Sequence, residues 1–320
     1  MKSNLKEIHP NEFNLVDEFL LNNFSSPTHR KEWNLVVSKY FNTEFFYFAC
    51  FRDKKIFGIC PVHRIKKKIT NYLISGPKQY LIPYGGWIFR AKAEVNPDLF
   101  ELKKNETVEV FSLPMLDEFN AEYKDLNVLK NYETAIIDLE RSEDDIWNSL
   151  NQKRRNMVRK AVKNNVQIYF LTEDKLPEFY DFYLKANQQY NLESLPFGYF
   201  EDLMRNKGNI NIDFITAKNG ENVFGFNVIL SDKNYSVYWL GIRLKESENN
   251  GSFDLLQWES IKKSKERNCK YYDLCYVEKE RLPNIYKFKT DFSDSIYPVL
   301  NFNKKSIVYS LINKVQKITD

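Results

Sequence analysis

The sequence predicts a mixed α/β protein that contains two domains of the same type. With 320 residues, the chain is too long for a single comfortable α/β core. Apolar runs of strand length alternate with amphipathic segments along the chain, which is typical of strands interleaved with helices. A short pattern also repeats: an apolar run, a charged turn, and then Phe57-Gly58 in the first half or Phe224-Gly225 in the second.

Composition indicates a folded protein and excludes some classes. Hydrophobic residues make up 43% of the chain, with 25 Phe and 20 Tyr, which a disordered chain would not carry. A net charge of +4 is too small to indicate nucleic-acid binding by itself. The first residues lack the apolar core of a signal peptide and no apolar run of about 18 residues occurs, so we expect a cytoplasmic protein.

The cysteines and histidines do not predict a metal site. The four cysteines show no CxxC spacing, and only three histidines are available to assist them. Cys50 and Cys60 lie in apolar runs, where a cysteine is most simply a small core residue. We therefore expect no bound metal and no tightly bound cofactor.

The first half of the chain is predicted to begin with helices and continue with strands. The expected elements, in order, are helices over 11–24 and around 33–40, a hairpin of strands over 45–52 and 56–62, and strands over 107–111 and 133–139. Between them lies the loop LIPYGGWIF, in which Gly85 and Gly86 allow backbone geometry or close approach that bulky residues forbid.

The second half is predicted to continue in the same style. The expected elements are a strand over 166–172, helices over 175–186 and 197–205, a hairpin of strands over 210–217 and 223–230, a strand over 235–240, a helix over 253–267, strands over 270–274 and 295–300, and a final helix with Ile307, Leu311 and Val315 on one stripe.

A single helix is predicted from Trp147 to Ile168, with one apolar and one cationic side. Six basic residues stand between Lys153 and Lys163, and no acid three or four residues away pairs with them. The ordinary interpretation of such a run is a solvated surface. The functional interpretation is that an anionic partner binds there.

A second candidate anion site precedes the helix predicted over 253–267. Asn250, Gly251 and Ser252 stand directly before it, and free backbone N–H groups at a helix start favour phosphate. This makes the three residues candidates for cofactor binding, with an ordinary N-cap as the alternative.

Five motifs of the second half, taken in order, resemble the Fem family of aminoacyltransferases, which is built from tandem acetyltransferase-like (GNAT) domains. They are KRRNMVRKAVKNNVQI, LPFGYFEDLM, VYWLGI, LLQWESIKKSKERNCKYYDL and IYKFKTDF. The first half resembles the family through Trp33, FGICPV and the YGG loop that contains Tyr84. The resemblance implies two GNAT-like domains, over 1–145 and 146–320.

The resemblance also implies amide formation, by transfer of an acyl or aminoacyl group onto an amine in a cleft between the domains. The family's Phe-Lys pair maps onto Phe288 and Lys289. Attack on an ester or thioester places negative charge on the carbonyl oxygen, which the Lys289 ammonium would stabilise. Because the motif reads Lys-x-Lys, Lys287 could take that position instead.

Further candidate residues follow from the same motifs. Arg155 and Arg159 match basic positions of the family's central helix, which implies a phosphate-bearing partner such as a nucleotide-linked acceptor or tRNA. Asp273 is the nearest candidate for a general base, although a carboxylate at a strand end is as often structural. Tyr238 and Tyr84 are candidates for substrate binding, although strand aromatics are more commonly core residues.

The sequence also departs from the family. Gln189, a further candidate for substrate binding, and Asn191 stand where relatives that act on peptidoglycan precursors commonly carry an Arg. A glutamine cannot neutralise the phosphate of the usual nucleotide-sugar acceptor, which indicates a changed acceptor, donor or both. The DLGG of many relatives is replaced by a sequence that ends Leu274, Cys275, Tyr276, and the helical arm of some members has no counterpart.

Three functions are compatible with these features. The first is an N-acyl or aminoacyl transferase acting on a cell-envelope precursor, with Lys289 stabilising the oxyanion and the basic helix binding an anion; its donor is aminoacyl-tRNA or acyl-CoA or an acyl carrier, and it would contact a membrane-linked acceptor peripherally. The second is an N-acetyltransferase that uses acyl-CoA or an acyl carrier on an amino sugar or amino acid; the missing Q/R-x-x-G-x-G/A loop argues against CoA. The third is a non-enzymatic RNA-binding module.

Overall fold

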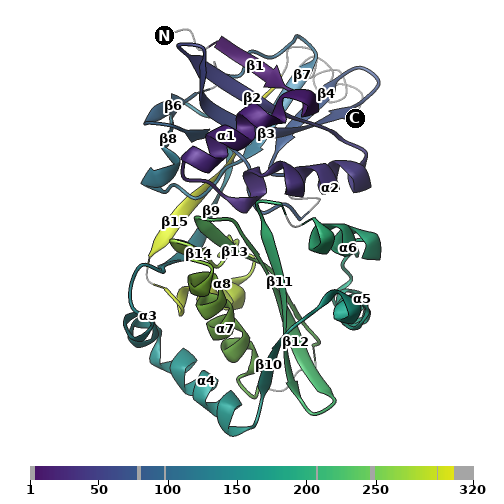
Figure 1. Ribbon diagram of the computed structural model, residues 1–320, viewed down its shortest axis with the longest axis vertical. Helices are drawn as coiled ribbons and strands as arrows, with labels where there is room; N and C mark the ends of the chain where they lie inside the picture. The colour runs from purple at the N-terminus through teal and green to yellow at the C-terminus, as the bar shows by residue number, and fades with distance from the viewer. Residues whose placement is uncertain are drawn as a thin grey trace. The chain divides into compact units, whose positions relative to one another are not determined.

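The computed structural model describes residues 4–305 except 78–80, 97–98, 207, 246–248 and 294. These residues form two compact units (Figure 1). One contains the chain up to Glu133 and the residues from Tyr297 onward, and the other is Thr134–Ile296. The division expected from the sequence, 1–145 and 146–320, differs at both ends of the second unit. Residues 297–305 belong to the first unit because Asn301 to Lys304 pair with Val108 to Phe111.

The first unit contains two helices and a mixed sheet. The helices are α1 (Phe13–Asn22) and α2 (Lys31–Phe41), and the strands of the sheet are β1 (Asn4–Ile8), β2 (Glu44–Arg52), β3 (Lys55–Lys66), β4 (Asn71–Ser75), β7 (Glu106–Phe111) and β15 (Ile296–Lys304). Their hydrogen-bonded order is β1-β2-β3-β4-β7-β15. The first unit also contains three short strands. β5 (Ile88–Phe89) and β6 (Ala93–Val95) lie between β4 and β7, and β8 (Ala121–Tyr123) follows β7.

The second unit contains the remaining helices and a mixed sheet of its own. The strands are β9 (Val128–Asp138), which enters from the first unit, β10 (Gln167–Phe170), β11 (Asn211–Asn219), β12 (Asn222–Ser231), β13 (Tyr235–Arg243) and β14 (Tyr271–Asp273). The helices are α3 (Glu143–Ser149), α4 (Gln152–Lys163), α5 (Leu176–Tyr190), α6 (Phe197–Arg205), α7 (Ser252–Glu266) and α8 (Pro283–Thr290). The hydrogen-bonded order is β10-β11-β12-β13-β14-β9.

The two sheets repeat one topology. In each, four strands pair antiparallel, β1 to β4 in the first unit and β10 to β13 in the second. The fifth strand then pairs parallel to the fourth, and the sixth pairs antiparallel to the fifth. Two helices separate the first and second strands in both units. This repetition confirms the predicted fold class, a tandem mixed α/β protein.

The Phe-Gly repeat marks the same structural position in both sheets. Gly58 pairs with Cys50 and Gly225 pairs with Ala217, and in each hairpin the register shifts directly after this pair. A side chain at Gly58 would lie 2.1 Å from the ring of Phe89, and one at Gly225 would lie 2.6 Å from the ring of Phe253. Glycine is required at both positions because an aromatic ring covers the strand.

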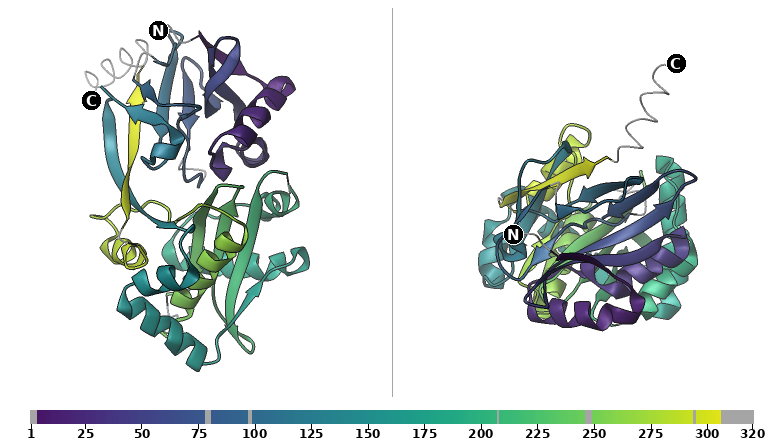
Figure 2. Two further views of the ribbon diagram at one scale, coloured as in Figure 1. Left: turned by 60° about the vertical axis from the view of Figure 1, so that its left-hand side comes forward. Right: turned by 90° about the horizontal axis from the view of Figure 1, so that it is seen from above.

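Successive residues of the second sheet pack against different helices. Phe214 contacts the rings of Phe179 on α5 and Phe200 on α6. Its neighbour Ile215 belongs instead to the core that α7 completes with Leu255. Because side chains alternate along a strand, α5 and α6 cover one face and α7 covers the other (Figure 2, left). Helix α4 joins the α7 side through Val158 and Ala161.

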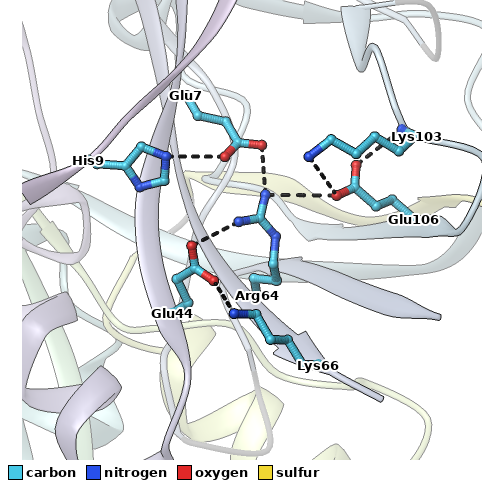
Figure 3. Close-up of polar contacts among 7 residues, drawn as sticks. All are labelled: Glu7, His9, Glu44, Arg64, Lys66, Lys103 and Glu106. Atoms are coloured by element: carbon cyan, nitrogen blue, oxygen red, sulfur yellow. Dashed lines mark hydrogen bonds and ion pairs between the residues drawn. The ribbon is translucent and has the colours of Figure 1, made fainter. Parts of the chain in front are cut away.

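A buried charge cluster lies in the sheet of the first unit (Figure 3). The Arg64 guanidinium, only 8% exposed, lies 2.6 Å from Glu7, 3.0 Å from Glu44 and 3.8 Å from Glu106. The guanidinium carbon also lies 4.5 Å from the centre of the Phe46 ring. Arg64 therefore neutralises carboxylates from three strands and the cluster serves to hold β1, β2, β3 and β7 together.

The structure corrects the long helix predicted over 147–168. It is interrupted at Leu150 and Asn151, whose side chain accepts a hydrogen bond from the Lys153 amide and caps α4. Val162, assigned to the apolar side, is 59% exposed. The break rotates α3 relative to α4, so one helical wheel cannot describe both. The predicted final helix with Ile307, Leu311 and Val315 lies outside the described residues.

Among the described residues, no helix combines the length and the apolar character needed to cross a bilayer.

Candidate active site in the second unit

The candidate site lies where two parallel strands of the second sheet part. β13 and β14 pair only from Tyr235 with Tyr271 to Val237 with Asp273. Beyond that point β14 ends, whereas β13 continues to Arg243. Tyr238 is the first residue of β13 after the pairing stops, and Cys275 and Tyr276 continue the chain that leaves β14.

Lys289 of α8 points at the residues that follow β14. Its Nζ donates hydrogen bonds to the carbonyl oxygens of Cys275, at 3.0 Å, and Tyr276, at 3.4 Å. It also lies 5.6 Å from the centre of the Tyr238 ring. Burial lowers the pKa of Lys289, and the nearby Cys275 and Asp273 oppose this change. The ammonium is therefore partly stripped of water and held by two carbonyls and a ring face.

Helix α8 presents its two lysines differently. Lys287 is 69% exposed and pairs with Asp291 at 3.1 Å, one turn along the same helix. Lys289 is half-buried and faces the end of β14. The geometry thus favours Lys289 over Lys287 for the role implied by the Phe-Lys motif. Phe288 packs into the core instead, with its ring 5.2 Å from that of Phe292.

Asp273 is fully buried and bound by several donors. The Tyr235 hydroxyl donates to it at 2.7 Å, the Cys275 amide donates at 2.7 Å, and the Thr134 hydroxyl also donates. A general base needs a lone pair directed at the substrate. The lone pairs of Asp273 accept hydrogen bonds from these donors instead. Asp273 therefore stabilises the turn that carries the Cys275 and Tyr276 carbonyls, which agrees with the structural role given above as the alternative to a general base.

That turn departs from ordinary backbone geometry at Cys275. Its φ is 61°, in the left-handed region that favours glycine, and its side chain is only 8% exposed. In this chain a cysteine adopts a conformation that glycine adopts without steric cost. The hydrogen bond from the Cys275 amide to Asp273 helps to stabilise the turn.

Arg154, which sequence reasoning did not select, is the best connected basic residue of α4. It is 8% exposed, lies 2.9 Å from Asp254 of α7 and 3.5 Å from Asp291, which caps α8, and stands 5.2 Å from the ring centre of Phe288. The carboxylates lie about 100 residues or more away in sequence, so a search for acids within α4 could not reveal them.

Arg155 and Arg159 make different contacts. Arg155 donates to the carbonyl oxygens of Asn148 and Leu150 and so caps the end of α3. Arg159 is exposed, stands 5.5 Å from the ring centre of Trp147, and donates to Asn156 at 3.2 Å. Of the two predicted anion contacts, Arg159 is exposed, whereas Arg155 is half-buried and already binds the end of α3.

The start of α7 is covered by α4. A side chain at Gly251, whose φ is 88°, would lie 2.0 Å from the carbonyl oxygen of Met157. Asn250 and Ser252 are buried, and the Asn250 side chain accepts from the Ser252 amide. The first turn also contains Asp254, already paired with Arg154. The geometry therefore supports the structural alternative, a helix cap, over a phosphate site at Asn250, Gly251 and Ser252.

The remaining predicted residues make contacts within their own units. Gln189, on α5, accepts a hydrogen bond from the Lys245 amide at 2.8 Å. Tyr84 belongs to the first unit, where it is fully buried and stacks on Phe111 with ring centres 6.3 Å apart. In the described ranges, no three His, Cys, Asp or Glu side chains gather as metal ligands would.

Sequence and structure comparisons agree with this architecture. Residues 117–218 match the model of the FemAB family. No curated protein sequence matches the chain. FemX has 12% identity and a TM-score of 0.65, covering 96% of this chain and 99% of FemX. L-PGS from Bacillus licheniformis has 11% identity and a TM-score of 0.54, covering 95% and 96%.

A tandem GNAT protein from the clavulanic acid biosynthesis pathway has 11% identity and a TM-score of 0.50, covering 94% of this chain and 98% of that one. Two sheets of one topology and this similarity define a tandem GNAT-like fold. The match over 117–218 is to the family whose motifs the sequence resembles, and it covers about a third of the chain.

Proposed function

We propose that this enzyme transfers an acyl or aminoacyl group from an ester or thioester to an amine of a cell-envelope precursor, with Lys289 stabilising the oxyanion. The reaction forms one C–N bond and breaks the C–O or C–S bond of the donor, and the alcohol or thiol leaves. The amine loses a proton to water or buffer, since we assign no general base.

The placement of Lys289 carries this proposal. An ammonium has three N–H donors. Two are directed at the carbonyls of Cys275 and Tyr276, and among the described residues no further acceptor forms a hydrogen bond with the ammonium. A partly desolvated ammonium gains more from a developing negative charge than a hydrated one, because the local dielectric screens less.

The donor we favour is an aminoacyl-tRNA. On α4, Lys153, Arg159, Lys160 and Lys163 are exposed, and within the described part of the chain no carboxylate pairs with them. Such a face can bind phosphates. The α7 start, where a CoA pyrophosphate was considered, is covered by α4 and already contains Asp254. Both observations support aminoacyl-tRNA over acyl-CoA as the donor.

The cell-envelope acceptor is supported by the similar proteins. FemX and L-PGS share the fold, and the family match is to FemAB. The tandem GNAT protein from clavulanic acid biosynthesis is described in a form without AcCoA, so acyl-CoA or an acyl carrier is the alternative donor, with an amino sugar or amino acid as acceptor. Peripheral contact with a membrane-linked acceptor is part of the first proposal.

The test begins with the acceptor. Mass spectrometry of extracts from cells with and without the gene should reveal a species that lacks one acyl or aminoacyl mass. The purified enzyme is then given that species with charged tRNA or with acetyl-CoA, and the amide product is measured. Product with acetyl-CoA alone would establish the alternative donor.

The matched variants are Lys289→Ala and Lys287→Ala on the same helix. Lys289→Ala should lower kcat by about 10²–10³, the usual effect of removing one oxyanion donor, while Lys287→Ala stays within about twofold. Unchanged turnover in Lys289→Ala would disprove the oxyanion role. If no acyl transfer occurs and the protein binds RNA with steep salt dependence, the RNA-binding module is the correct function.

A further inference from the structure

Arg154 connects three helices of the second unit. It projects from α4, its Nη1 lies 2.9 Å from Asp254 on α7, and its Nε lies 3.5 Å from Asp291 at the end of α8. All three side chains are about nine-tenths buried. A buried arginine with two carboxylates is restrained, because moving away would leave charges without partners in a low dielectric.

The contacts of Arg154 flank Lys289 in sequence. Phe288, whose ring centre is 5.2 Å from the guanidinium carbon, precedes Lys289, and Asp291 follows two residues later. The α8 end is also held to α4 by the hydrogen bond from the Asn151 amide to the Asp291 carbonyl at 2.9 Å. Since α8 has only eight residues, fixing Phe288 and Asp291 fixes where Lys289 points.

We propose that Arg154 is a positioning residue of the active site: by binding Asp254 and Asp291 and stacking on Phe288, it sets the rotation of α8 that brings Lys289 to the Cys275 and Tyr276 carbonyls. This inference rests on the proposed role of Lys289. Arg154 itself contacts no reacting atom. The basic character of α4 is thus divided between one buried, structural arginine and an exposed cationic face.

The requirement for arginine follows from geometry. A guanidinium presents donors in a planar fork, so one side chain reaches two carboxylates and still offers a flat face to an aromatic ring. A lysine could pair with one carboxylate but not with both while stacking. We therefore expect Arg154→Lys to keep the fold but to shift α8. Arg154→Met should remove the ion pairs with both Asp254 and Asp291.

The first test needs no substrate. Lysine amines are labelled competitively with acetic anhydride from about pH 7 to about pH 11, and peptides that contain positions 287 and 289 are resolved by mass spectrometry. In the native protein, Lys289 should titrate below the ordinary lysine value, since burial lowers its pKa. In Arg154→Met, Lys289 should become more accessible and its titration should move up toward that value, while Lys287 serves as the internal reference.

The matched control is Arg159→Met, on the same helix and exposed, which should leave the Lys289 profile unchanged. A folded Arg154→Met protein with a native Lys289 profile would overturn the proposal. If Arg154→Met does not fold, Asp291→Asn and Arg154→Lys answer the same question, because each weakens the link to α8 while keeping a polar partner; native Lys289 profiles in both would equally overturn it.

Turnover separates this inference from the proposed function. With the acceptor identified, Arg154→Met should lower kcat by about 10²-fold with KM within about twofold, because a misplaced catalytic group costs rate rather than binding. If the Lys289 profile changes but Lys289→Ala remains active, positioning is correct and the oxyanion role is wrong. If Lys289→Ala is inactive and the profile is unaffected by Arg154→Met, the positioning role is wrong.

Discussion

The hydroxyl oxygen of Tyr238 occupies the space where a side chain at Gly241 would begin, since a Cβ there would lie 1.7 Å from it. This relationship depends on a register shift between β12 and β13: Leu240 pairs with Val228, but the next pair is Tyr238 with Ile229. The extra residue lets the Tyr238 ring lie along its own strand. The ring then stands beneath the Lys289 ammonium.

Gly241→Ala should therefore displace Tyr238 and weaken the site. A methyl group at this distance requires the Tyr238 side chain to move. Because Gly241 is exposed and the methyl would meet the tip of a side chain, the cost in the free energy of unfolding should lie at the low end of the about 1–3 kcal/mol of overpacked sites. Turnover should fall together with stability, because the ring that faces Lys289 moves. Urea unfolding and the amide-forming assay measure the two effects.

A double-mutant cycle identifies the cause of that loss. In a Tyr238→Ala background the clash is absent, so adding Gly241→Ala should cost much less than it does in the native protein. Equal costs in both backgrounds would mean that glycine is needed at 241 for its backbone and not to accommodate Tyr238.

Acid should destabilise the first unit through two buried histidines. Burial lowers the pKa of both His29 and His63 from 6.5 to about 3. Between pH 6.5 and about 3 these two histidines are protonated in the unfolded chain but neutral in the folded one. The free energy of unfolding that is present above pH 6.5 is therefore lost as pH falls toward 3. Each histidine contributes a slope of up to about 1.4 kcal/mol per pH unit.

Hydrogen exchange can locate this effect, since all three histidines precede residue 64 and the second unit contains none. Peptides of β2 and β3 should lose protection between neutral pH and pH 5, and His63→Gln should reduce the loss.

The second unit should respond in the opposite direction. Burial raises the pKa of Asp254 from 3.8 to about 6, so the contribution of Asp254 to the free energy of unfolding is present below pH 3.8 and is lost as pH rises through 6. Parallel losses in both units, unaffected by His63→Gln, would contradict this account.

Removing the Arg64 charge should strongly destabilise the first unit. Arg64→Met leaves Glu106, 3% exposed, with Lys103 at 3.8 Å as its remaining cation among the described residues, and leaving a buried carboxylate without its main partner costs about 3–5 kcal/mol in the free energy of unfolding. Denaturant unfolding measures the loss.

The control for Arg64 is Lys92→Met. Lys92 is 64% exposed and lies 3.6 Å from the exposed Asp117, so the loss of this pair should cost less than about 1 kcal/mol. Similar costs for the two variants would show that burial does not strengthen the Arg64 cluster.

Local patterns predicted most elements of the fold. Apolar runs located the β2–β3 and β11–β12 hairpins, and helical spacing located α6 at its observed bounds, Phe197–Arg205. The Phe-Gly repeat was a short sequence signal, yet it marks equivalent positions because each glycine lies under a ring, Phe89 or Phe253. The helix break at Asn151 was missed because an N-cap inside a periodic pattern is easily read as helix.

The candidate site was only partly predictable. The Phe-Lys motif located Lys289 through a family resemblance, but its hydrogen bonds to Cys275 and Tyr276 depend on how β14 ends. The role of Arg154 was hidden because its carboxylate partners come from α7 and the end of α8. Conversely, Gly251 resembled a phosphate loop in the sequence, whereas α4 covers it in the structure.

The sequence alone determined that this protein has two units of one α/β type, because periodicity, turn residues and the repeated glycine are local properties of the chain. Tertiary structure alone decided which charges are buried and which face solvent. Residues 154 and 159 are both arginines on one helix, but only Arg154 has carboxylates from distant segments beside it. Charge burial depends on partners brought together by folding, and no local pattern encodes them.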